Sequence, residues 1–123
     1  RGALSTKISF STTPLPGAVS IPELDKTVQS KEADTVIADV RSPSDWLRTG
    51  VIPDSLLIPI DTTNRRWSEV PKDKKVIVLC AAGNRALQVW RLLKDKGYKD
   101  IYWVDGKLAK YSNGILQKGI YGK

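Results

Sequence analysis

The chain has 123 residues, of which 41% are hydrophobic and 27% charged, and this composition fits one globular domain that needs no disulfide or metal cross-links. It contains no His and a single Cys, which excludes a Ser-His-Asp triad, a Cys-His pair, an intrachain disulfide and a thiolate metal cluster, so we expect no metal and no cofactor. The net charge of +7 lies almost wholly at the chain ends, because residues 23–105 hold 14 basic and 13 acidic residues, and this predicts solvated basic ends and no nucleic-acid partner.

Residues 1–18 are rich in Ser, Thr, Pro and Gly, hold no acidic residue and show no period. They predict an extended or flexible N-terminal arm, followed by one domain over 19–123. An acid-free, Ser/Thr-rich start also fits a processed organellar or export segment, and an arbitrary boundary explains it equally well, so the compartment stays open. No apolar run approaches the roughly 18 residues of a membrane span, and we expect none.

The first elements of the domain are a capped helix and a buried strand. Ser20 and Glu23 have the spacing of a capping box, in which each side chain bonds the main-chain N–H of the other residue. Three apolar residues then share one helical face: Ile21, Leu24 and Val28. The β-branched run over 35–40 predicts a buried strand.

A second, shorter helix follows that strand. Ser42 provides the N-cap, Pro43 suits the first helical position and Asp45 places an acid in the first turn. Gly50 ends the helix. Residues 55–60 then predict another strand.

The strongest strand signal is the apolar run over 75–80. After a short loop, residues 85–96 predict an amphipathic helix that Gly97 ends, and residues 101–104 predict a further strand. Strands that alternate with helices in this way predict an α/β fold, with a central, mainly parallel sheet and helices on both faces. Such sheets place their sites at the carboxyl ends of the strands.

Cys80 lies at the carboxyl end of the strongest strand, and the loop after it leads directly to a helix N-terminus. Main-chain N–H groups converge at such a junction, which favours a thiolate over a thiol. Gly83 lets the loop turn with a positive φ, and Arg85 adds positive charge. A lone Cys among apolar residues is usually an inert core residue. The loop-helix junction with Gly83 and Arg85 favours a nucleophile instead.

Three ordered segments resemble sequence signatures of the rhodanese family. Residues 80–85, Cys-Ala-Ala-Gly-Asn-Arg, are similar to the active loop of that family in its C-x-x-G-N-R form. Asp39-Val40-Arg41 resembles the D-V-R signature, and residues 46–55 resemble the W-x-x-T-G-x-I-P-G-S segment. The resemblance covers about residues 19–106. Three signatures in the right order make it specific, whereas any one alone is weak.

This resemblance implies a single-domain sulfurtransferase with a rhodanese-like fold. Cys80 is then the nucleophile, which takes sulfane sulfur from thiosulfate or a persulfide, carries it as a persulfide and passes it to a thiol or cyanide. The implied substrate-binding residues form the loop: Ala81, Ala82, Gly83, Asn84 and Arg85. Asp39 and Arg41 are expected to support the loop through an ion pair or carbonyl contacts, with an ordinary strand-end salt bridge as the alternative.

The sequence departs from the family pattern in several places. Asp54 and Val51 replace the usual Gly and His of the second segment, and Ala86 replaces a Ser or Thr beside the loop. After Gly106 the usual second Gly and a later Trp are missing, so the conformation of the C-terminal segment stays open. The four Trp residues are expected to serve packing rather than ligand binding: Trp46, Trp67, Trp90 and Trp103.

Two other functions stay open. A non-catalytic docking or sulfur-carrier module could use the basic ends to recruit an acidic protein sulfur acceptor or a fused neighbour. The other alternative is a Cys-loop phosphatase or arsenate reductase, whose loop has one more residue between Cys and Arg. Four residues separate Cys80 and Arg85 in this chain, and this shorter loop suits a sulfur atom better than a tetrahedral oxyanion. Because Arg85 is the only charged residue of the loop, we expect weak binding of dianionic thiosulfate. The physiological donor and acceptor and the oligomeric state stay open.

Overall fold

The computed structural model describes residues 15–108, 115–119 and 121, which form one parallel β-sheet covered by helices on both faces. The described strands lie in the order β2-β6-β5-β3-β4, and every neighbouring pair is parallel. They are β2 (Ala18–Val19), β3 (Thr35–Asp39), β4 (Leu56–Leu57), β5 (Lys75–Leu79) and β6 (Ile101–Val104). This arrangement confirms the predicted α/β class.

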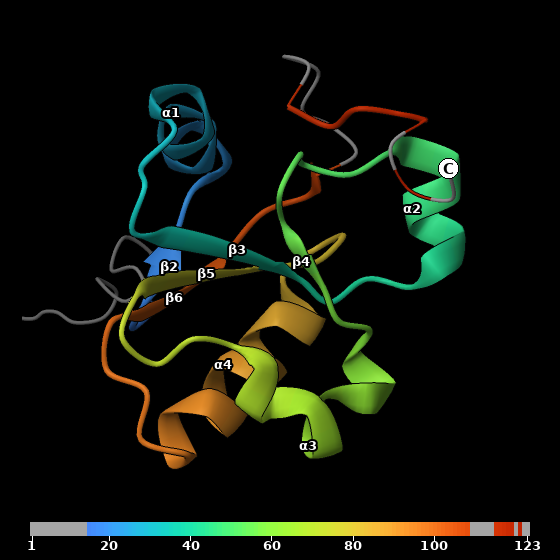
Figure 1. Cartoon of the computed structure of the whole chain (residues 1–123). Helices are drawn as coiled ribbons and strands as arrows, with labels where there is room; N and C mark the ends of the chain where they lie inside the picture. Colours follow the sequence, from blue (N-terminus) through green and yellow to red (C-terminus); the bar gives the residue numbers. More distant parts are fainter. Residues whose placement is uncertain (1–14, 109–114, 120, 122–123) are drawn as a thin grey trace, which may run out of the picture.

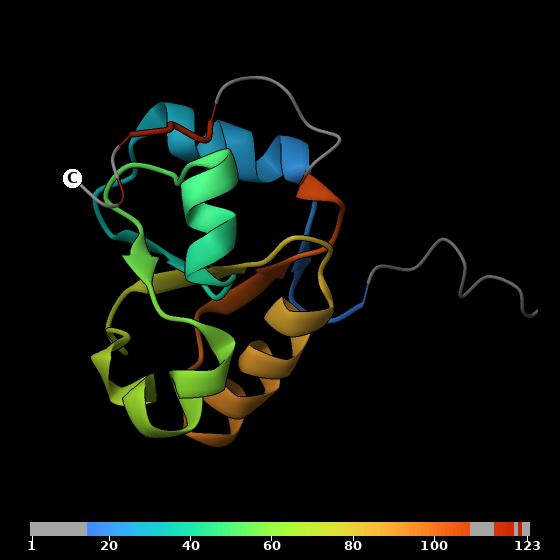
Figure 2. The same cartoon turned by 90° about the vertical axis from the view of Figure 1, so that its right-hand side faces the viewer.

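Helices flank the sheet on both sides. In the described part of the chain the α-helices are α1 (Ile21–Ser30), α2 (Pro43–Thr49), α3 (Thr63–Arg66) and α4 (Asn84–Asp95). Figures 1 and 2 show α1 and α2 on one face of the sheet, and α3 and α4 on the other. Because the strands all run the same way, the helices that follow β3 and β5 both begin at the carboxyl edge of the sheet. No described helix combines the length and apolar character that a membrane crossing needs.

The predicted starts of the first two helices are confirmed, and α4 begins at Asn84, one residue before its predicted start. The Glu23 N–H donates to Ser20 Oγ at 3.2 Å, and the Ser20 N–H donates to Glu23 Oε1 at 2.8 Å, which completes a capping box on α1. Ser42 and Asp45 form the same reciprocal pair at the start of α2. Gly50 ends α2 with φ +89°, a left-handed conformation that favours glycine.

The predicted strand over 55–60 is wrong in length, because β4 covers only Leu56–Leu57. The Ile58 and Ile60 N–H groups still bond to the carbonyls of Asp39 and Val40, but these acceptors are consecutive residues and not the alternate residues of a regular parallel ladder. The chain then turns into the 3₁₀ helix η2 (Ile60–Thr62). This segment, α3 and the 3₁₀ helix η3 (Trp67–Glu69) together connect β4 to β5, and the sequence analysis predicted none of them.

β5 is buried on both faces, which explains its uninterrupted apolar run. Val76 and Val78 pack in the cluster on the α4 side, whereas Ile77 and Leu79 pack in the cluster on the α1 side. Each of these four residues is at most 1% exposed. Complete burial of such a side chain stabilises a fold by about 1.5–3 kcal/mol. Cys80 continues the alternation into the α4-side cluster, so the core holds the end of β5 rigidly.

The start of the described chain is tied to β6. The Trp103 N–H donates to the carbonyl of Gly17, and its indole Nε1 donates to the carbonyl of Pro16, both at 2.9 Å. Ala18 belongs to β2, so the sheet begins one residue before the predicted start of the domain. Most of the predicted arm, residues 1–14, lies outside the described residues.

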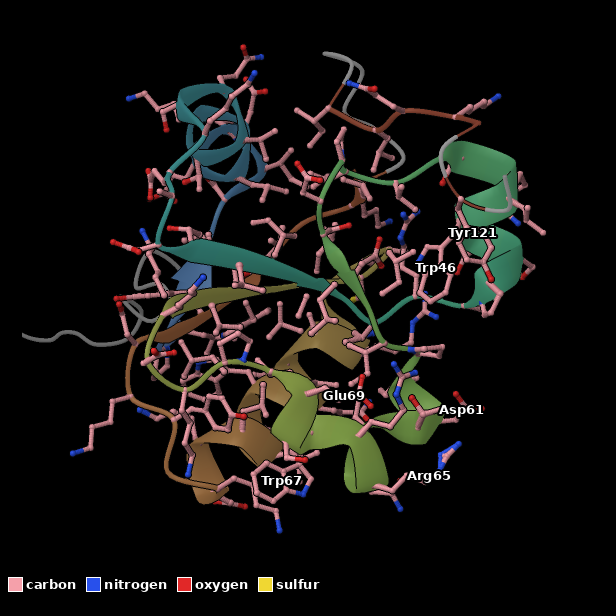
Figure 3. All side chains as sticks on the ribbon, in the orientation of Figure 1. Trp46, Asp61, Arg65, Trp67, Glu69 and Tyr121 are labelled. Atoms are coloured by element: carbon pink, nitrogen blue, oxygen red, sulfur yellow. The ribbon has the colours of Figure 1, made fainter. Side chains whose placement is uncertain are left out.

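The C-terminal residues 115–119 and 121 pack beside α2. Val51 and Gln117 exchange main-chain hydrogen bonds of 3.0 and 2.7 Å. Figure 3 shows the ring of Tyr121 beside that of Trp46, and the ring centroids are 5.1 Å apart in an edge-to-face arrangement. Of the C-terminal segment whose conformation the sequence left open, the described residues Gln117 and Tyr121 therefore contact Val51, just after α2, and Trp46 of α2.

Gly50→Ala is expected to lower the free energy of unfolding by about 2–4 kcal/mol. A Cβ at this position would lie 2.6 Å from the main-chain carbonyl of Gln117, and the left-handed φ adds strain. Gly119→Ala is the matched control, because its φ is +84° and a Cβ there would meet nothing within 4 Å. Urea unfolding curves of both variants test the prediction. Equal losses in the two variants would show that the contact with Gln117 is unimportant.

Candidate active site

Cys80 is the first residue after β5 and lies at the carboxyl edge of the sheet. Its Sγ accepts hydrogen bonds from the main-chain N–H groups of Gly83 at 3.0 Å and Ala86 at 3.2 Å. The chain therefore wraps around the sulfur, and the residue is 1% exposed. Two N–H donors aimed at one sulfur stabilise negative charge on that atom more than they stabilise a neutral thiol.

The loop around Cys80 joins a helix with free N–H groups. Asn84 and Arg85 are the first two residues of α4, and their main-chain N–H groups have no acceptor among the described residues. They lie at the positive end of the α4 dipole, in the same loop as Cys80. An anion held at this loop can therefore be met by further main-chain donors.

Glycine is required at the turn of the loop. Gly83 has φ +101°, a conformation that other residues rarely adopt. A Cβ there would make ordinary contacts, 3.4 Å from the carbonyl oxygen of Val104 and 3.6 Å from Oδ1 of Asp105. The Leu108 N–H donates to the carbonyl of Ala81 at 2.9 Å. The chain after β6 thus packs against the loop and holds it in place.

Arg85 and Asp45 meet across the carboxyl edge of the sheet. Their Nη2 and Oδ2 atoms are 3.6 Å apart, and the side chains are 33% and 16% exposed. In Figure 2 the first turn of α2 and the chain between β5 and α4 both lie on this edge. Adjacent parallel strands β3 and β5 place the two helix starts there, so the contact follows from the sheet order.

Asp45 is held in its ionised form. Burial acts to raise the pKa of Asp45, but hydrogen bonds from the main chain and hydroxyl of Ser42 and from Arg48, with the charge of Arg85, outweigh burial and lower the pKa below its ordinary value of 3.8. The Arg48 Nη2 lies 2.7 Å from Asp45 Oδ1. The side chain of Asp45 therefore carries a full negative charge at neutral pH.

Asp39 and Arg41 form a buried ion pair beside the loop. Arg41 donates to both carboxylate oxygens of Asp39, with Nη2 at 2.8 Å, and the residues are 0% and 2% exposed. Arg41 also donates to Thr49 Oγ1 at 2.7 Å and to the carbonyl of Gly50 at 2.8 Å. Among the described residues, none of the bonds of this pair reaches residues 80–85. The pair therefore clamps the C-terminal end of α2. Its link to the loop is through the sheet, because Asp39 pairs with Leu79 and the Val40 N–H donates to the carbonyl of Leu79 at 2.9 Å, one residue before Cys80.

The structure thus brings together Cys80 and the loop residues that follow it. It places the Asp39–Arg41 pair against the C-terminal end of α2. The sequence analysis treated Asp45 only as an acid in the first turn of a helix, and Ala86 only as a residue without the hydroxyl common at that position. The structure shows that Asp45 contacts Arg85 and that the Ala86 N–H donates to the sulfur. The predicted parallel sheet was the sequence signal for the contact between Asp45 and Arg85, because it places the starts of the helices that follow the strands at one edge of the sheet. The described residues contain no cluster of three or more His, Cys, Asp and Glu side chains suited to a metal ion.

Comparison with known proteins gives concordant matches. A family model described as "Rhodanese-like domain" matches residues 20–113. A protein named "Sulfurtransferase" from Allochromatium vinosum is 32% identical over 89 residues, covering 72% of this chain and 76% of that protein. A "tRNA sulfurtransferase" from Desulfurococcus amylolyticus is 31% identical over 96 residues, covering 78% of this chain and 19% of that protein.

The solved structure of a rhodanese-related protein also matches this chain. The rhodanese-related protein from Thermoplasma volcanium is 26% identical, with a TM-score of 0.65, and the match covers 76% of this chain and 87% of that one. The chain therefore spans most of two of these proteins but about a fifth of the tRNA sulfurtransferase. The family match includes Cys80 with its loop, the Asp39–Arg41 pair and the whole of α2.

Proposed function

The chain belongs to the rhodanese-like family, and from this premise we propose that it transfers sulfane sulfur through a persulfide on Cys80. The observation that carries the proposal is the pair of main-chain N–H groups, from Gly83 and Ala86, that point at Cys80 Sγ. They can donate to the sulfur when it attacks the donor and to the charged sulfur of the loaded protein. No His is needed for either role.

In the first half-reaction the thiolate of Cys80 attacks the outer sulfur of the donor. With thiosulfate, a new S–S bond forms to Cys80, the S–S bond of thiosulfate breaks, and sulfite leaves with the electron pair. With a low-mass persulfide, the same attack releases the thiolate of the donor. Each reaction leaves Cys80 as a persulfide and consumes no oxidant or reductant.

In the second half-reaction a nucleophile attacks the outer sulfur of the Cys80 persulfide. Cyanide takes this sulfur as thiocyanate, or a thiolate takes it as a new persulfide, and Cys80 leaves as the thiolate. The outer sulfur carries negative charge until it is transferred, and the main-chain N–H groups of Asn84 and Arg85, which have no acceptor among the described residues, are donors available to it. The substrate-binding role that we assign to these residues is therefore carried mainly by main-chain atoms.

The mass of the intact protein tests the proposal. The chain is incubated with thiosulfate or with glutathione persulfide, freed of donor and measured without reductant. A gain of the mass of one sulfur atom is expected, and later addition of cyanide should remove that mass and release thiocyanate. A protein whose mass stays unchanged with both donors would favour a docking module instead.

A further inference from the structure

The loop over 80–85 carries one charged side chain, that of Arg85. Its guanidinium lies 3.6 Å from a carboxylate oxygen of Asp45, a residue of a different element, α2. A second acidic residue, Asp105, follows β6 and places its Oδ1 3.6 Å from the position of a Cβ on Gly83. One carboxylate, that of Asp45, therefore lies beside the positive charge of the loop, and a second, that of Asp105, lies beside Gly83.

Asp45 is a fixed part of this arrangement. Its Oδ2 accepts from the main-chain N–H and the hydroxyl of Ser42, at 3.3 and 3.0 Å, so the capping box sets the direction of the carboxylate. Its other oxygen accepts from Arg48, whose side chain is 66% exposed and therefore strongly screened by water. Arg41 is already neutralised by Asp39. The charge that faces Arg85 is thus dominated by Asp45.

We propose that Asp45 determines which sulfur donor the protein accepts, by pairing with Arg85 and so disfavouring dianionic donors such as thiosulfate against persulfides of low-mass thiols. The inference rests on the proposed function and deepens it by naming the charge class of the substrate. Asp45 acts through Arg85 and through its own field, and is a positioning residue.

The physical argument concerns the difference in charge between donors. Thiosulfate carries two negative charges, whereas the persulfide of an uncharged thiol carries at most one. A carboxylate beside the only guanidinium of the loop repels an anion and so offsets the attraction that this guanidinium exerts. The repulsion energy is proportional to the charge of the anion, so it is twice as large for a dianion as for a monoanion. Because the Arg85 side chain is about one-third exposed, water screens the effect, and a moderate change in donor preference is expected.

The test compares kcat/KM for thiosulfate and for β-mercaptoethanol persulfide, with cyanide as the acceptor in both assays. In Asp45→Asn the ratio of thiosulfate to persulfide activity should rise about twofold to fivefold, while Asp45→Glu should keep the ratio of the unchanged chain. The persulfide rate serves as an internal standard, because a merely structural loss lowers both rates together. Asp45→Gln provides a second neutral variant that can replace Asp45→Asn if that protein does not fold.

Asp73→Asn is the matched control, because Asp73 precedes β5 and so lies at the opposite edge of the sheet, and its ratio should stay unchanged. If the unchanged chain transfers sulfur but the neutral variants at position 45 keep its donor ratio, the inference is overturned and the proposed function stands. If the unchanged chain transfers sulfur from neither donor, the proposed function itself fails.

Discussion

Cys80→Ser is expected to lower the rate of thiocyanate formation by about a thousandfold or more with either donor. A serine hydroxyl is a poor nucleophile toward sulfur, and its oxygen cannot carry sulfane sulfur as a persulfide. No other thiol in the chain can take over, since Cys80 is the only Cys. The initial rate of thiocyanate formation and the intact mass after donor treatment are the two measurements.

The fold should survive this substitution, because Ser is close to Cys in size and the N–H groups of Gly83 and Ala86 can donate to its hydroxyl. Tryptophan fluorescence and the unfolding midpoint check this point. Ser68→Ala, an exposed change in η3, controls for the handling of the variants and should keep full activity. Sulfur transfer that persists in Cys80→Ser would remove Cys80 from the mechanism.

Asp39→Ala is expected to reduce the free energy of unfolding by about 3–5 kcal/mol. The substitution leaves the guanidinium of Arg41 almost wholly buried without its carboxylate partner. It also removes the fixed acceptor that aims Arg41 at Thr49 and Gly50, so the end of α2 loses its clamp. Since small domains are stable by about 5–15 kcal/mol in total, this loss is a large fraction. Urea unfolding followed by circular dichroism measures it.

Glu69→Gln is the matched control for this prediction. It breaks the ion pair between Glu69 and Arg66, which has a similar N–O distance of 2.8 Å but is exposed to water. Because solvent already screens that pair, the unfolding midpoint should hardly move. Equal losses in the two variants would show that burial of the Asp39–Arg41 pair contributes nothing to its importance.

Most elements that position the site were predictable from local patterns. The capping residues Ser20 and Ser42 start α1 and α2 where expected, because a cap is decided by residues within one helical turn. The run that ends at Cys80 also predicted β5, since a strand buried on both faces must be apolar throughout. The short β4 was not predictable, because regular pairing ends where Ile58 and Ile60 bond to consecutive carbonyls of the neighbouring strand and its continuation, and the sequence does not show which carbonyls face that segment.

The sequence by itself determined the α/β class, the position of Cys80 at a strand end and the helix that follows it, because each is written in a continuous stretch of the chain. Only the tertiary structure decided that Asp45 pairs with Arg85 and that Arg41 clamps the end of α2 rather than bonding the loop. The Asp45–Arg85 contact joins helices that follow two different strands, so it depends on the order of strands in the sheet, in which β3 and β5 are neighbours. The Arg41 contacts span only eight and nine residues, and they depend on how α2 packs. Local patterns carry no record of that order, because it arises only when all the strands are packed together.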